Sequence, residues 1–312
     1  MKKNKIFISI ALIVCCVLIG GIGTLNQHNL SLKTNTVKAS STKTNYIPTS
    51  KKTYTNSSED KEALLNLMIN SIQYFNTAEG NFSYFSKNAE TDMDVNFIVD
   101  LNNNKSYEQN TFKNSLTRSN ENLYEESIFN GEYYMTFTNN NLNENNSSKR
   151  ANQESQFHYV KINIPKTEKQ SKVPERKISD MYLNYNGEKI YNPTQDNAYM
   201  GISKTLLLPQ DIAIGFMGTD YSKWEILSNS MFLDRNAIII ESQLNDYYQA
   251  KHNSSKASII VDSETGILLQ IVLKDDNEND TFRITMNNLE LNNSVNQQTF
   301  DKYIDYIDEE EN

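Results

Sequence analysis

The segment SIIVDSETGILLQIVLKDDNENDTFRITMNNLEL, residues 258–291, decides the fold class of this chain. Apolar side chains recur at every second position over Ile267–Leu273 and again over Thr281–Leu289. A period of two is typical of strands that bury one face. The turn at 263–266 separates this pair from an earlier strand, Ser258–Asp262. The segment therefore predicts an antiparallel meander, a structure in which neighbouring strands follow one another along the chain.

Further strands are predicted before this segment. Residues 95–101 alternate between apolar and polar, and so do residues 157–164. The pairs Asn130-Gly131 and Asn186-Gly187 each lie inside a strand-like region, and Asn-Gly readily adopts the positive φ angles of a two-residue hairpin turn. A strand is also expected at Ala237–Gln243. The sheet should therefore be predominantly antiparallel.

Two helical segments accompany the strands. Apolar residues at three-to-four spacing predict an amphipathic helix from about Ser58 to Phe75, which we expect Gly80 to end. The second segment is Pro209–Phe216, because proline suits the first turn of a helix and Gly218 suits its end. The chain is thus of the α+β class.

The N-terminus predicts export. Three lysines within the first five residues precede an uncharged run of 20 residues, 6–25, which is long enough to span a bilayer of about 30 Å as a helix. The basic flank should stay in the cytoplasm. The run is either a single-span anchor or a secretory signal that is cleaved after Ala39, and both readings stay open. Residues 26–57 are polar and predict a flexible linker.

Charge and cysteine content exclude several functions. The chain has a formal charge of −9, and residues 1–39 contain five lysines and no acid, so the rest has 25 basic and 39 acidic residues, or −14. A surface of that sign repels nucleic acid. Cys15 and Cys16 are the only cysteines, and both lie in the apolar run, so the exported part folds without a disulfide.

Catalytic and metal-binding patterns are missing. Of the three histidines, His28 lies in the linker, His158 begins a strand, and His252 lies in a polar stretch where we expect it to be solvated. Asp275, together with the asparagines two and four residues later, resembles the start of a calcium loop, but the turn glycine and the final glutamate are absent. We therefore predict plain turn chemistry there, no cofactor, no metal and no enzymatic activity.

Residues 228–292 add a family resemblance. They contain an apolar strand, a strand that closes in the turn Asp262-x-x-Thr265-Gly266, and two further strands that run to Asn292. This order resembles the MucB/RseB type of the LolA-like lipoprotein-carrier superfamily, and residues 58–227 are compatible with it. The resemblance implies a strongly curved antiparallel sheet, a half-barrel, wrapped around one or two helices. The domain would span residues 58–293 and precede an acidic tail at 294–312, which we expect to fray from Asp305.

The same resemblance implies a binding function. Proteins of this type carry or sense acylated molecules and regulate extracytoplasmic sigma-factor signalling. One hypothesis is that the domain holds an acyl chain or lipoprotein segment against its apolar face. The other is that it binds an anti-sigma factor or another membrane protein without a lipid ligand. The candidate lining residues, whose alternative role is core packing under the helix, are Val99, Ile162, Leu269, Ile271 and Ile284.

Overall fold

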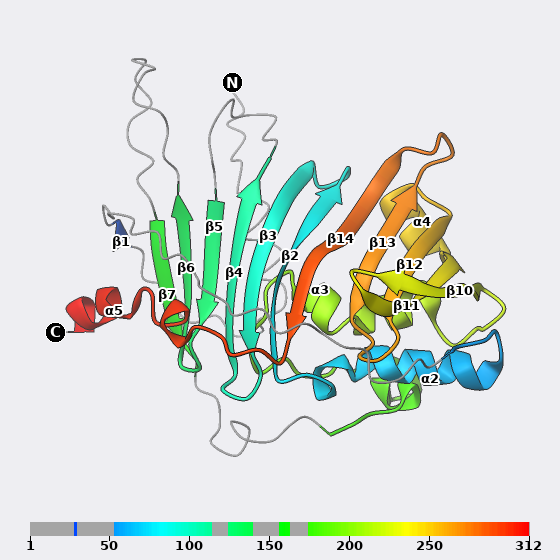
Figure 1. Ribbon diagram of the computed structural model, residues 1–312, viewed down its shortest axis with the longest axis horizontal. Coiled ribbons are helices and arrows are strands. Elements are labelled where there is room, and N and C mark those ends of the chain that lie inside the picture. The colour runs from blue at the N-terminus through cyan, green and yellow to red at the C-terminus, as the bar shows by residue number, and fades with distance from the viewer. Residues whose placement is uncertain (1–27, 30–52, 114–123, 140–155, 163–173, 312) are drawn as a thin grey trace.

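The computed structural model describes residues 28–29, 53–113, 124–139, 156–162 and 174–311. Strands dominate this part of the chain (Figure 1). Their bounds are β1 (His28–Asn29), β2 (Thr77–Ser86), β3 (Thr91–Asp100), β4 (Lys105–Phe112), β5 (Tyr124–Phe129), β6 (Tyr133–Asn139), β7 (Gln156–Lys161), β8 (Tyr182–Tyr185), β9 (Glu188–Tyr191), β10 (Trp224–Phe232), β11 (Arg235–Gln243), β12 (Lys256–Asp262), β13 (Leu268–Lys274) and β14 (Asp280–Leu291).

Twelve of these strands form one sheet in the order β1-β7-β6-β5-β4-β3-β2-β14-β13-β12-β11-β10, and every neighbouring pair is antiparallel. Figure 1 shows β5–β7 standing upright and β11 and β12 lying across the view, so the strand direction turns strongly along the sheet. The hydrogen-bonded order begins at β1 and ends at β10, and over the described residues the sheet is open. The predicted antiparallel, sheet-dominated fold is confirmed, without closure.

Short helices accompany the sheet. They are α2 (Ser58–Ile69), α3 (Lys204–Leu207), α4 (Asp246–His252), α5 (Ile304–Glu311), the 3-10 turns η1 (Ser71–Gln73), η2 (Ile178–Met181) and η4 (Gln297–Thr299), and the π-helical turn η3 (Ile212–Met217). The α2 helix begins where predicted, because the Ser57 hydroxyl accepts the Asp60 N–H at 3.1 Å. Gly218, with φ +70°, ends η3 as predicted.

Gly80 does not end the first helix. Helix α2 stops at Ile69, a 3-10 turn follows, and Gly80 lies within β2 opposite Leu289 of β14. A Cβ at Gly80 would lie 2.2 Å from the Asn288 carbonyl oxygen, beside a break in the β2–β14 register between Met286 and Asn288. The glycine therefore permits two strands to approach closely at a bulge, a use of glycine that local sequence does not distinguish from helix termination.

The sheet has an inner face and an outer face, each with its own hydrophobic cluster. The inner cluster joins the sheet to α2, α3 and η3, and four side chains of α2, Leu64, Leu65, Met68 and Ile69, are fully buried in it. The outer cluster lies on the opposite face of β3–β7, beneath the C-terminal segment. Its fully or nearly fully buried members are Ile98, Ile128, Tyr133, Met135, Phe137, Phe157, Phe300, Tyr303 and Ile307.

The C-terminal segment differs from the expected frayed tail. Residues 304–311 form α5, and Ile307 is fully buried in the outer cluster. The Lys302 ammonium contacts the Glu126 carboxylate at 2.7 Å, and the Tyr303 hydroxyl donates to the same carboxylate. Figure 1 shows this segment passing across the lower ends of β5–β7. Apolar residues interspersed among the acids decide the outcome, because they give the tail one face to bury.

Both predicted Asn-Gly hairpins are confirmed. The first joins β5 to β6, with Gly131 at φ +95°, and the second joins β8 to β9, with Gly187 at φ +85°. Among the described residues, no helix has the length and apolar character needed to cross a bilayer. The apolar run at 6–25 lies outside those residues, so its prediction as an anchor or signal is not addressed by this structure.

Candidate functional site

Four of the five predicted lining residues lie together in the inner cluster. Val99, Leu269 and Ile271 are fully buried, and Ile284 is 1% exposed. Ile271 and Ile284 are direct cross-strand partners in β13 and β14. Their neighbours in the cluster include the side chains of α2, α3 and η3, so this half of the inner face, on β2, β3 and β10–β14, is packed by the chain itself. We call it the filled half.

Ile162 lies elsewhere. It follows β7 directly, is half-buried, and donates its N–H to the Glu132 carbonyl at 2.7 Å. It belongs to neither the inner nor the outer cluster. Whether any of the five residues contacts a ligand stays a prediction, but the structure separates Ile162 from the other four.

The inner face continues past the filled half onto β4–β7, and we call this part the shelf. The strand register places its side chains in three rows that continue from Val99, Phe97 and Val95 of β3. Most of these side chains are polar, and Phe129, Tyr134 and Val160 belong to neither hydrophobic cluster. Ser106, Glu108 and Phe129 are buried, and the other described side chains of the rows are half-buried. The first row is Ser106, Phe129, Tyr134 and Val160, the second is Glu108, Ser127, Thr136 and His158, and the third is Asn110, Glu125 and Thr138.

Residues 194–203, which we call the strap, lie against the β4 side of the shelf. Glu108 is 2% exposed, and its carboxylate accepts the N–H of Ile202 at 2.9 Å and the N–H of Ser203 at 2.8 Å. The Ser106 hydroxyl donates to the Tyr199 carbonyl at 3.1 Å. The Tyr199 ring lies 4.6 Å from the ring of Phe129, centroid to centroid. The strap thus forms one wall of the shelf.

The acidic groups of this region favour their protonated forms more than usual. Burial raises the pKa of Glu108, although the N–H groups of Ser203 and Ile202 oppose the change. Burial also raises the pKa of Glu125 on the next strand. Asp196 of the strap keeps some solvent contact, yet dense packing around it raises its pKa to about 6, against the nearby Lys204 and the Ala198 N–H.

The turn motif Asp262-x-x-Thr265-Gly266 has a structural role. The Asp262 carboxylate is fully buried and accepts the Thr265 N–H and hydroxyl, each at 2.8 Å. It also accepts Nε of Arg235, itself 1% exposed, at 2.5 Å. A Cβ on Gly266 would lie 2.5 Å from the Leu67 carbonyl oxygen of α2, so the glycine lets the helix approach this turn. The sequence prediction missed Arg235.

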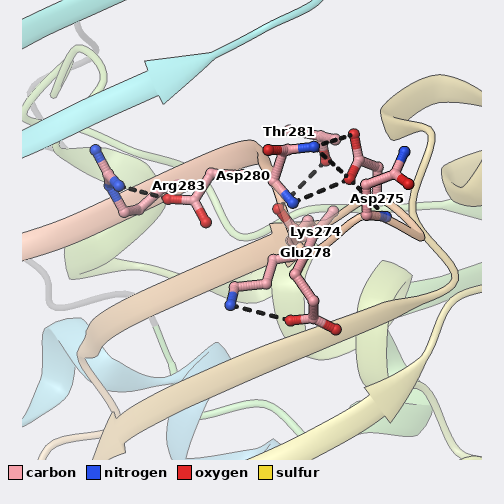
Figure 2. Close-up of polar contacts among 9 residues, drawn as sticks. Lys274, Asp275, Glu278, Asp280, Thr281 and Arg283 are labelled. Carbon is pink, nitrogen blue, oxygen red and sulfur yellow. Dashed lines mark hydrogen bonds and ion pairs between the residues drawn. The ribbon is translucent and has the colours of Figure 1, made fainter.

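The segment that resembles a calcium loop is the β13–β14 turn, shown in Figure 2. Asp275 Oδ1 accepts the N–H of Asn277 and the N–H of Asn279, both at 3.0 Å. These backbone bonds lower the pKa of Asp275. The carboxylate therefore closes the turn. Across the described residues, no three His, Cys, Asp or Glu side chains are grouped as a metal site requires.

His252 is not solvated, contrary to expectation. It ends α4, is 8% exposed, and its ring lies 5.1 Å from that of Phe282 and 5.9 Å from that of Phe216. Burial lowers its pKa. It packs among aromatic rings because the polar stretch that contains it forms helix α4, which turns the ring toward the sheet.

No family model and no curated protein sequence matches the chain. The crystal structure of MucB is similar with a TM-score of 0.40 and 11% identity, covering 78% of this chain and 62% of that one. The Pseudomonas aeruginosa MucA/MucB complex gives 0.37 and 11%, covering 77% and 60%. This chain therefore spans less than two thirds of those MucB chains.

A LolA superfamily protein, NE2245 from Nitrosomonas europaea, is similar with a TM-score of 0.21 and 7% identity, covering 78% of this chain and 96% of that chain. The structural comparison thus finds MucB and a LolA-superfamily protein. These are the groups that the late strands resemble.

Proposed function

We propose that this chain is a non-enzymatic, extracytoplasmic binding module that holds an acyl chain, free or on a lipoprotein segment, on the β4–β7 shelf. One observation carries the proposal: beyond the strap, the inner-face side chains of Tyr134 and Val160 are half-buried and belong to neither hydrophobic cluster, whereas the filled half is packed by the chain's own helices. In this reading Ile162 is the predicted lining residue that meets the ligand. The N-terminal run would hold the module on the outer face of the cytoplasmic membrane, or the module is secreted after cleavage at Ala39.

The first row of the shelf offers the apolar contact beyond the strap. Phe129 is fully buried and its ring packs against Tyr199, so the contact comes from Tyr134 and Val160, which are half-buried, and from Ile162, which continues their face at the end of β7. Each methylene removed from water there would contribute about 0.8 kcal/mol, so even part of an acyl chain gives useful affinity. The second and third rows supply hydroxyl, amide and carboxyl groups for a polar end. Binding needs no nucleophile in this arrangement.

Titration of residues 40–312 with a fluorescent fatty acid tests the proposal. We expect saturable binding that Val160→Asn weakens about tenfold or more. Lys161→Asn is the matched control, because Lys161 points to the outer face and is exposed. Absence of saturable binding, or an equal effect of both substitutions, would exclude the shelf as an acyl site.

A second candidate is a regulator that binds an anti-sigma factor or another membrane protein. It is favoured by Leu227 and Met231, each 55% exposed on the edge strand β10, because apolar side chains on a sheet edge suit a protein partner. Purification from native membranes discriminates between the two. A carrier should retain lipid by mass spectrometry, whereas a regulator should retain one defined protein and lose it in Leu227→Ser/Met231→Ser.

A further inference from the structure

The third row of the shelf contains a buried oxygen that lacks a hydrogen-bond donor. Asn110 Oδ1 is buried and accepts no hydrogen bond from the described residues. The amide group of the same side chain donates to Glu108, so Oδ1 is the end that is left over. Thr194 Oγ1 and Asn197 Oδ1, both of the strap, are buried without a partner in the same part of the chain. Such atoms are destabilising unless a water, an ion or a ligand meets them.

Glu125 is the direct cross-strand partner of Asn110 on the inner face, and Cβ atoms in such a pair lie about 5 Å apart. Burial raises the pKa of Glu125, and no ion pair or hydrogen bond of the described residues opposes that change. Glu126, the next residue, faces the opposite side of the sheet and has its partners there. Its carboxylate contacts the Lys302 ammonium at 2.7 Å and accepts the Tyr107 hydroxyl at 3.0 Å. The outer carboxylate is thus neutralised, whereas the inner one is not.

Basic residues are absent from the inner-face rows of β4–β7. These four strands contain two lysines and no arginine, and both, Lys105 and Lys161, lie over aromatic rings of the outer cluster. The three rows and the strap together contain the acids Glu108, Glu125 and Asp196 and no lysine or arginine. The wall and floor of the shelf therefore present uncompensated negative charge to a ligand.

Two basic groups adjoin this region without pairing with Glu125. Lys204 follows the strap, and its charge acts on Asp196. His158 lies in the second row on β7, two strands away from Glu125. The position between Asn110 and Glu125 therefore lacks a cation from the described residues.

A primary ammonium group matches these acceptors. It brings a positive charge and three N–H donors, and it has no acceptor of its own to leave unpaired. It would favour the ionised form of Glu125 by supplying the opposite charge, and it would give Asn110 Oδ1 a donor. A carboxylate or phosphate would instead place a like charge beside Glu125 and could not donate to Asn110. The acceptors and charges thus favour an ammonium over an anionic polar end.

The apolar contact lies at a suitable separation from this position. Tyr134 and Val160 belong to the first row, and the third row lies four residues further along each strand. Four extended residues span about 13 Å. A ligand that reaches both must therefore have an alkyl chain of several methylenes between its apolar end and its polar group.

We propose that Glu125 and Asn110 bind the ammonium group of the ligand whose acyl or alkyl chain lies on the first row of the shelf. The inference rests on the proposed function and names its ligand class, an acyl chain with an amine at its polar end. Two sources have that chemistry. One is a lipid with an amine headgroup, and the other is the free α-amino group of a protein segment acylated at its first residue.

Calorimetric titration of the full chain in phosphatidylcholine nanodiscs tests the inference, with empty nanodiscs as the blank. The probes are octylammonium, octanoate and octylglycerol, which share an eight-carbon chain. Octylammonium should bind at least about tenfold more tightly than the other two, because charge attraction is strong where solvent contact is reduced. Glu125→Gln should lower that preference to less than about threefold. Glu278→Gln is the control, since this side chain is 83% exposed in the β13–β14 turn, and it should leave the preference unchanged.

Equal affinities for octylammonium and octylglycerol would overturn the inference, and this wild-type contrast does not depend on any variant folding. An equal effect of the two substitutions would also overturn it, because the preference would then come from the acidic surface in general. In both cases the alkyl probes still saturate the shelf and Val160→Asn still weakens them, so the proposed function stands. If none of the three probes saturates, the shelf itself is excluded as a binding site.

Two larger probes distinguish the sources of the ammonium. Lysophosphatidylethanolamine has its amine on a lipid headgroup, and a peptide that begins with S-octylcysteine has a free α-amino group beside its alkyl chain. The probe that represents the source should bind more tightly than its N-acetylated form, and Glu125→Gln should remove the difference. If neither probe is distinguished from its N-acetylated form, ammonium recognition is overturned.

Discussion

The filled half and the shelf are two parts of one sheet face, and they differ in what covers them. On β13 and β14 the inner-face side chains are apolar and pack against α2, α3 and η3. On β4–β7 the same face presents polar rows beside one apolar row and meets the strap. Alternation in the sequence identifies which side chains share a face, but it does not tell whether the chain's own helices already occupy that face.

Asp262→Ala should have the largest effect, because it leaves the buried Arg235 guanidinium without its carboxylate. We expect the free energy of unfolding to fall by about 3–5 kcal/mol. Asp280→Ala is the control, since the Asp280–Arg283 pair of Figure 2 is partly exposed and should contribute about 0–1 kcal/mol. Urea denaturation measures both. A loss of stability in Asp262→Ala as small as that in Asp280→Ala would mean that the filled half does not depend on the Asp262–Arg235 ion pair.

Ile271→Ala and Ile162→Ala sharpen the comparison directly. The first removes a fully buried side chain and should lower the free energy of unfolding by about 2–5 kcal/mol while leaving fatty-acid affinity unchanged in the folded fraction. The second removes a half-buried side chain at the shelf and should change stability by less than about 1 kcal/mol while weakening fatty-acid binding. Denaturation and probe titration on each variant give the readout. The reverse pattern would return the ligand site to the filled half.

Gly266→Ala tests how closely α2 approaches the turn motif. Both the φ of +75° and the 2.5 Å approach to Leu67 oppose a Cβ, so we expect a loss of about 2 kcal/mol or more. Gly187→Ala has φ +85° but no heavy atom within 4 Å of the added Cβ, and should lose about 1 kcal/mol from backbone strain alone. If thermal denaturation gives equal losses, contact with α2 does not constrain Gly266.

Asp196→Asn should have the smallest effect, seen as a change in pH dependence. Folding raises the pKa of Asp196 from 3.8 to about 6, so its contribution favours the native state below about pH 4 and is lost as pH rises through 6. The effect is on the order of 1 kcal/mol, because residual solvent contact reduces it. Asp196→Asn should flatten this decline in urea midpoints. The lowered pKa of Asp275 gives stability that is lost as pH falls, so Asp275→Asn should flatten the decline in urea midpoints on the acid side.

Local sequence patterns predicted those elements whose key residues have one common structural role. Both Asn-Gly turns, the end of η3 at Gly218 and the late meander follow from turn geometry and alternation. Gly80 and His252 were misread, since a glycine at a strand bulge and a histidine in an aromatic cluster look locally like a helix end and a loop residue. The α5 helix was not predicted because acidic residues flank Ile307 in the sequence, so the segment looks like a charged tail.

The sequence contains almost no pattern that predicts the shelf. Residues 105–112, KSYEQNTF, are too polar to stand out as a strand, and Glu108 is distinguished only by the backbone N–H groups of Ile202 and Ser203, which lie 94 and 95 residues away in the sequence. The one signal was Gly201, since a Cβ there would lie 2.6 Å from the Glu108 carboxylate. A lone glycine in a polar loop does not indicate such a contact without the fold.

The amino-acid order by itself determined the antiparallel sheet, its hairpin turns and the two-faced strands, because periodicity and turn residues act over a few neighbouring positions. Tertiary structure decided which half of the inner face is packed, which carboxylates are buried and which apolar side chains stay on the surface. Those outcomes depend on contacts between residues far apart in the chain, whose geometry exists only once the sheet has formed.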